Sequence, residues 1–120
     1  MARAVTPRQR WEGLAAIALY DAKELARRCD RSRRQLERDF RRCLGRSPQD
    51  WLNEQRILAA RRLLLSGLSV KAVGIELGFK QTSHFCRHFK LRCRLTPSEF
   101  VRRNVRPKRK RARATRARIR

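Results

Sequence analysis

One helical pattern occurs twice in this chain, and the repeat restricts the possible fold more than any other feature. In the first copy, Ala26 lies in a short apolar stretch, Asp30 follows four residues later, and Leu36 and Phe40 begin a second stretch. The residues at the same places in the second copy are Gly74, Gly78, Phe85 and Phe89. The offset is 48 residues before the turn and 49 after it, so the second turn is one residue longer. Two small helical units are therefore expected.

The second stretch of each copy has one apolar face and one basic face. At 100° per residue, Leu36, Phe40 and Cys43 share one stripe, as do Phe85 and Phe89. Roughly opposite these stripes lie Arg34, Arg38 and Arg41 in the first copy and Ser83, Arg87 and Lys90 in the second. A single such helix is most often only a solvated surface. Two matched copies, each behind a small residue and a tight turn, instead indicate helix-turn-helix units, whose second helix enters the major groove.

Capping residues predict where the other helices begin. Thr6-Pro7 predicts a helix that continues as far as Ile17, and Asp21 predicts a short helix that ends near Cys29. Ser32 is the expected N-cap of the first basic helix. In the longer second turn, Phe79 is expected to fill the core.

A longer helix is expected between the two copies, from Ser47-Pro48 to Gly67. Its apolar residues form three stripes rather than one, which predicts that both units pack on it and that it sets their separation. One of these stripes consists of Trp51, Leu58 and Leu65.

The net charge of +23 predicts a polyanionic partner, most often nucleic acid. Residues 102–120 hold 11 Lys and Arg and no acid, so this tail is expected to be disordered, and the rest of the chain keeps a charge of +12 without it. No apolar run approaches the ~20 residues of a membrane-spanning helix. The N-terminus lacks a secretory signal, so the cytoplasm is the expected location and a membrane partner is not expected.

Neither a metal nor a cofactor is expected. The four cysteines have no zinc spacing and are interpreted as small, reduced and buried apolar residues: Cys29, Cys43, Cys86 and Cys93. His84 and His88 are one helical turn apart, but no acidic third ligand lies near them.

From about Asp21 to Arg103, the chain resembles the AraC/XylS family of bacterial transcription regulators. The resemblance is carried by Leu25-Ala26, Ser32, Leu36, Phe40, Gly45, Pro48, Arg56 to Leu65, Val70, Gly78-Phe79, Ser83, Phe85, Phe89-Lys90, Pro97 and Phe100. It implies an all-α fold with two homeodomain-like helix-turn-helix subdomains joined by a linker helix. The expected parts are residues 1–46 and 67–103 for the two units, 47–66 for the linker helix and 104–120 for the tail.

The resemblance also implies sequence-specific DNA binding, with both recognition helices in successive major grooves. No enzymatic activity is expected, because the sequence shows neither a nucleophile–base pair nor a zinc set. The implied base-contacting residues are Arg34, Glu37, Arg38, Thr82, Ser83, Cys86 and Arg87. The expected phosphate contacts are Ser32, Arg33, Arg41, Lys71, Gln81 and Lys90. The helical angles favour most of the base contacts independently, whereas Thr82 rests mainly on the resemblance, with a phosphate contact as its alternative role.

The expected partners are double-stranded DNA, bound by a monomer, and RNA polymerase. Many family members carry an effector-binding domain, for which 120 residues leave no room, so the chain is expected to be either a small stand-alone regulator or a fragment of a larger one. Arg94 stands where the family usually has glycine, which predicts an altered turn before Pro97. Gly74 replaces the usual alanine and lowers the local helix propensity.

Three rival interpretations remain at this point. A non-specific architectural or RNA-binding protein would explain the tail but not the matched helices. A DNA-repair enzyme with a related domain would need a nucleophile–base pair or a zinc set, and neither is visible. A cationic membrane binder would need an amphipathic face that the internal core does not already use.

Deleting residues 104–120 tests the role of the tail. The slope of log K against log salt is expected to flatten by several units, because each phosphate that is neutralised contributes about 0.9. The preferred DNA sequence is expected to stay the same. Binding titrations over a salt series check the first expectation, and a changed sequence preference would show that the tail contacts bases.

Overall fold

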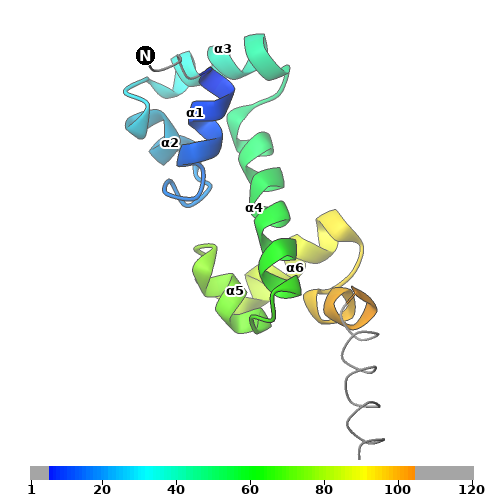
Figure 1. Cartoon of the computed structure of the whole chain (residues 1–120). Coiled ribbons are helices and arrows are strands. Elements are labelled where there is room, and N and C mark those ends of the chain that lie inside the picture. Colours follow the sequence, from blue (N-terminus) through cyan, green and yellow to red (C-terminus); the bar gives the residue numbers. More distant parts are fainter. Residues whose placement is uncertain (1–5, 105–120) are drawn as a thin grey trace, which may run out of the picture. The chain divides into compact units, whose positions relative to one another are not determined.

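The computed structural model describes residues 6–104, and over this range the chain is all helical, with no strand (Figure 1). The all-α fold predicted from the sequence is thereby confirmed. The chain divides into two compact units, one extending to Ala59 and the other beginning at Ala60. The boundary falls inside one helix, α4, which spans Pro48–Leu65. The basic tail beyond residue 104 lies outside the described residues.

The N-terminal unit contains α1 (Pro7–Leu14), α2 (Ala22–Arg28), α3 (Arg33–Leu44) and the first part of α4. The predicted N-caps are confirmed. The Thr6 side chain accepts a hydrogen bond from the Gln9 backbone N–H, and the Asp21 side chain accepts one from the Glu24 N–H. Each cap satisfies a backbone donor that has no partner within its own helix.

The first helix is shorter than predicted, because α1 ends at Leu14 and the chain turns over residues 15–20. Leu19 and Tyr20 have φ angles of 52° and 58°, a left-handed conformation that stops a right-handed helix. Ile17, which was expected on the helix, is 54% exposed in this turn. The Gln49 side chain holds the turn by donating to the Tyr20 carbonyl at 2.9 Å and accepting from the Ala22 N–H at 2.9 Å.

Aromatic rings form the centre of the N-terminal unit. Phe40 is fully buried on α3, and its ring stacks on Trp11 of α1 with 3.7 Å between the centroids. On another side it meets Trp51 of α4 at 5.5 Å. One α3 side chain therefore joins three helices, and rings of this size dominate the burial energy of a small core.

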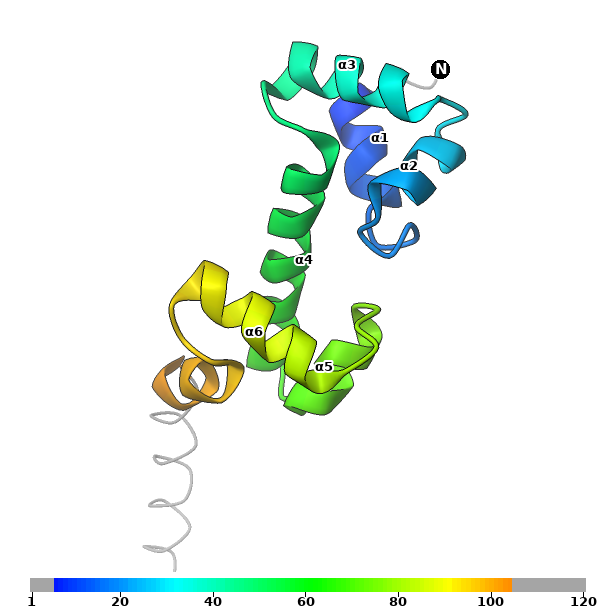
Figure 2. The ribbon, with the colours of Figure 1, turned by 180° about the vertical axis from the view of Figure 1, so that it is seen from behind.

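The C-terminal unit contains the end of α4, then α5 (Val70–Glu76), α6 (Thr82–Cys93) and a helical stretch over residues 97–104 (Figure 2). Four phenylalanines form a continuous chain of ring contacts through it. The centroid distances are 5.3 Å for Phe79–Phe85, 5.8 Å for Phe85–Phe89 and 5.5 Å for Phe89–Phe100. Phe85 and Phe89 are fully buried, as predicted, whereas Phe79 is only half-buried.

Two predictions about burial are wrong. In the Trp51 stripe of α4, Leu58 and Leu65 are 44% and 48% exposed. Only Trp51, the first member of this stripe, has an aromatic partner from another helix. Cys43 is exposed rather than buried, although it shares the stripe of Phe40, and it lies next to the last residue of α3. Of the other cysteines Cys29 is buried, and the remaining two are partly exposed.

Replacing Gly74 with alanine is expected to stabilise the C-terminal unit by about 1 kcal/mol, because glycine is that much less favourable inside a helix. A Cβ at this position would lie 3.5 Å from the Phe85 Cβ, which is an ordinary van der Waals contact. Denaturant unfolding of Gly74→Ala measures the gain. Gly45→Ala is the control, because the φ of 69° at Gly45 penalises a side chain and predicts a loss of stability.

Arg94 keeps the turn that glycine would make, so the prediction of an altered turn is wrong. Its φ and ψ are 65° and 11°, close to the 69° and 21° of Gly45 at the matching place after α3. The departure from the family pattern therefore appears as strain in one residue, since a side chain in this conformation costs ~1–2 kcal/mol.

Arg94→Gly is accordingly expected to raise the free energy of unfolding by about 1 kcal/mol, through relief of that strain. Arg94→Ala separates the backbone effect from the loss of charge, because alanine removes the guanidinium and keeps the Cβ. Equal stabilisation by both variants in denaturant unfolding would show that charge repulsion, not φ, is relieved.

Candidate nucleic-acid interface

The two turns that position the basic helices have the same backbone geometry. In the N-terminal unit, the Arg31 N–H donates to the Ala26 carbonyl at 2.9 Å. In the C-terminal unit, the Phe79 N–H donates to the Gly74 carbonyl, also at 2.9 Å. The residues before them, Asp30 and Gly78, are both left-handed, with φ of 60° and 86°. The repeat seen in the sequence is thus a repeat of structure.

Side chains secure the first turn against α3. Ser32 and Gln35 form a reciprocal capping box at the start of the helix. Asp39 of α3 pairs at 3.0 Å with Arg31 of the turn and with Arg42 one turn further along. Two of the unit's many cations therefore share a single carboxylate partner on α3.

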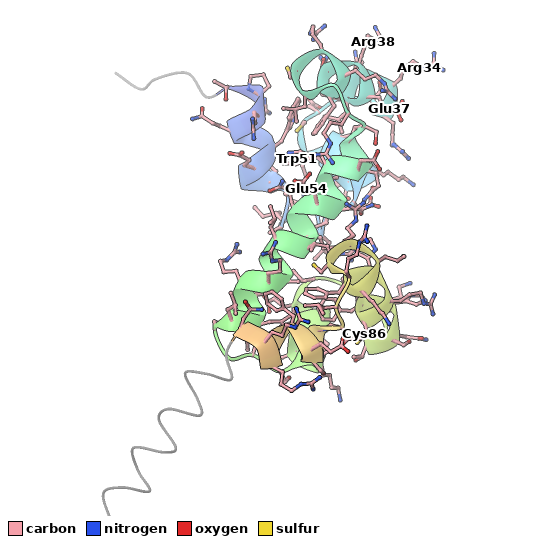
Figure 3. The ribbon with its side chains drawn as sticks, turned by 90° about the vertical axis from the view of Figure 1, so that its right-hand side faces the viewer. Arg34, Glu37, Arg38, Trp51, Glu54 and Cys86 are labelled. Atoms are coloured by element: carbon pink, nitrogen blue, oxygen red, sulfur yellow. The ribbon has the colours of Figure 1, made fainter. Side chains whose placement is uncertain are left out.

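The opposite side of α3 carries the predicted base-contacting residues. Arg34, Glu37 and Arg38 are exposed and project away from the helix (Figure 3). Among the described residues, no carboxylate forms an ion pair with Arg34 or Arg38. Both guanidiniums consequently remain available to an anionic or hydrogen-bonding partner.

The arginines of α2 contrast with those of α3. Glu24 pairs with Arg27 at 2.6 Å and with Arg28 at 3.0 Å. The hydrogen bond from Arg27 lowers the pKa of the Glu24 carboxyl, and the positive charges of both arginines act in the same direction. Arg27 and Arg28 thus share a carboxylate partner on their own helix, whereas Arg34 and Arg38 of α3 have none among the described residues.

On α6, the predicted residues Thr82, Ser83 and Arg87 are exposed. Cys86 of α6 is half-buried (Figure 3). The N-cap of α6 is Gln81, whose side chain makes no capping hydrogen bond to the helix backbone. The start of α6 therefore differs from the start of α3 in having no side-chain cap.

The structure places the predicted phosphate contacts on exposed positions around the two helices. They are Ser32, Arg33, Arg41, Lys71, Gln81 and Lys90. Lys71 lies on α5, whereas the others lie on or at the start of α3 and α6. Helix N-termini and basic side chains are common phosphate ligands.

Leu91 was not singled out from the sequence. It lies one turn after Arg87 on α6 and is 75% exposed. Together with Arg87, Lys90 and Arg94 it lines a shallow hollow of about 440 Å³. The sequence could have indicated this exposed position, because Leu91 lies at nearly the same angle around the helix as Arg87.

Other kinds of site receive no support from the described part of the chain. Within residues 6–104, no three His, Cys, Asp or Glu side chains come together in a way that could hold a metal ion. None of the helices in the same range combines the length and apolar content that crossing a membrane requires.

Two matched turns, each followed by a buried aromatic stripe and an exposed basic face, define a DNA-binding helix-turn-helix protein. The family model described as "Helix-turn-helix domain" matches residues 25–103. The chain belongs to this helix-turn-helix family, of the AraC type, and the resemblance noted from the sequence is confirmed.

A relative in Yersinia enterocolitica, "Virulence regulon transcriptional activator VirF", is 41% identical over 56 residues, which cover 46% of this chain and 21% of the relative. The chain therefore spans about a fifth of the length of such relatives.

Two solved structures share the fold. A DNA-binding transcriptional dual regulator from Escherichia coli K-12 superposes with a TM-score of 0.70 at 24% identity, over 85% of this chain and 96% of that one. An AraC-type transcriptional regulator from Chromobacterium violaceum superposes with a TM-score of 0.64 at 27% identity, over 85% and 99%. These proteins are transcription regulators, a non-enzymatic class, in agreement with the prediction from the sequence.

Proposed function

We propose that this chain is the sequence-specific DNA-binding part of a bacterial transcription regulator, and that α3 and α6 each enter a major groove. The observation that carries the proposal is the matched pair of turns, each presenting an exposed basic helix face. A protein that binds nucleic acid only through its charge does not need two helices that each follow the same turn and carry a basic face at the same positions. The family resemblance supports the further proposal that the two grooves are successive.

Affinity and specificity come from different residues in this proposal. Contacts from the basic surface to phosphates supply much of the affinity, independent of sequence. Arg38 and Arg87 are proposed to make bidentate contacts with guanine, each worth ~1–3 kcal/mol of discrimination. Cys86 offers only van der Waals contact, which suits a thymine methyl group. Arg34, Glu37, Thr82 and Ser83 complete the proposed base contacts.

The proposed setting follows from the class of protein. A regulator of this type acts in the cytoplasm, where bacterial DNA lies, and RNA polymerase is its proposed protein partner. Because one chain carries two recognition helices, a monomer can contact two segments of one site without a second copy.

Selection of bound sequences from a random DNA pool is the decisive experiment. We expect the enriched sequences to contain two conserved blocks, one for each recognition helix. A pool that stays random after repeated rounds would support non-specific binding instead and would overturn the proposal.

Arg38→Ala and Arg87→Ala are each expected to weaken binding to the selected sequence by ~1–3 kcal/mol, with much less effect on random DNA. Unfolding should not change, since Arg38 and Arg87 are exposed and unpaired among the described residues. Arg33→Ala and Lys90→Ala are the matched controls on the same two helices. As phosphate contacts, they should weaken binding to both DNAs equally. Equal losses for Arg38→Ala and Arg87→Ala would assign those residues to phosphate as well.

A further inference from the structure

A second cationic feature lies in the C-terminal unit, apart from the proposed base contacts. A cavity of about 540 Å³ is lined by Arg61 of α4, Arg92 of α6 and Arg103 of the helical stretch over 97–104, together with Cys93 and Phe100. Its volume is in the range of sites for small ligands. Among the described residues that line it, none carries a carboxylate.

The three arginines of this cavity have no ion-pair partner among the described residues. The hollow beside α1 is different. It is also lined by three arginines, but Asp39 lies among them and pairs with two, Arg31 and Arg42. The basic composition of the chain alone therefore does not explain why the three arginines of the cavity have no carboxylate beside them. Three like charges in one concavity repel one another, and a bound anion would relieve that repulsion.

Packing contacts hold part of the cluster in place. The Arg61 guanidinium lies over the buried Phe100 ring, 5.7 Å from its centroid. The half-buried Cys93 thiol lies close enough to feel the Arg61 charge, which opposes the increase in pKa that burial causes. A guanidinium restrained in this way loses less rotamer freedom when it binds an oxyanion.

The cavity is turned away from the proposed base-contacting face. Arg92 lies about 140° around α6 from Arg87, near the angle of the buried Phe85. When Arg87 faces a major groove, Arg92 therefore does not face the same groove. The guanidiniums of the cavity are left for a different anion.

We propose that the cavity formed by Arg61, Arg92 and Arg103 binds a small polyvalent phosphate, either a polyphosphate or a phosphate ester. Guanidinium forks match the oxygens of a phosphate bidentately, and three of them balance about three negative charges. The site goes beyond the proposed DNA binding and does not depend on it.

Calorimetric titration of the 120-residue chain with inorganic pyrophosphate, at constant ionic strength, tests the site. The expected result is saturable binding of one pyrophosphate, at least tenfold weaker in the double variant Arg61→Gln/Arg103→Gln. The matched control is Arg62→Gln/Arg102→Gln, which removes the same charge from neighbouring positions that do not line the cavity. The control should bind within twofold of the unaltered chain. Equal losses in both double variants, or no saturable binding, would overturn the proposal.

Arg92→Gln alone provides an independent variant that leaves the Arg61–Phe100 contact intact. It should also weaken pyrophosphate binding, with unchanged helical content by circular dichroism. DNA titrations over a salt series distinguish a free phosphate compound from the DNA backbone as the ligand of the cavity. If Arg61→Gln/Arg103→Gln reduces the salt slope by about 1.8, as the loss of two phosphate contacts would, and the control does not, the cavity binds DNA backbone. The free-anion proposal would then be abandoned, whatever the outcome for sequence-specific binding.

Discussion

The backbone turn that joins the two helices of each unit is the constraint on which the other features depend. A helix carbonyl, at Ala26 or Gly74, accepts a hydrogen bond from an N–H five residues later, and the residue before that donor is left-handed. This closes the turn within a few residues and sets the direction of the next helix. Once that direction is set, Phe40 or Phe85 is buried and the basic face must point outward.

The two units reach this geometry with different side chains. The first uses polar groups, namely the Ser32–Gln35 capping box and the Arg31–Asp39 ion pair. The second has one more residue in the turn and uses the Phe79 ring, which packs on Phe85. Because the backbone hydrogen bonds are alike in both, the geometry does not depend on one kind of side-chain contact.

Left-handed residues end or connect several of the helices, and the chain does not always supply glycine for them. Gly45 and Gly78 adopt this conformation at no steric cost, whereas Arg94 and Asp30 adopt it with a side chain. Asp is tolerated there better than most residues, but Arg is not. The C-terminal unit therefore carries two local penalties, strain at Arg94 and low helix propensity at Gly74, and its continuous chain of four phenylalanine rings offsets them.

Periodicity and capping chemistry are local properties of a sequence, and they were enough to predict most of the helices, the repeat, the turn residues and the outward positions of Arg38 and Arg87. Those properties cannot show how far along a stripe the packing continues. Ile17, Cys43, Leu58 and Leu65 were therefore predicted to be buried or helical where the structure exposes them or turns the chain. The convergence of Arg61, Arg92 and Arg103 on one cavity could not be predicted from these local properties. Those residues come from three separate helical elements, and only packing of the elements brings distant side chains together.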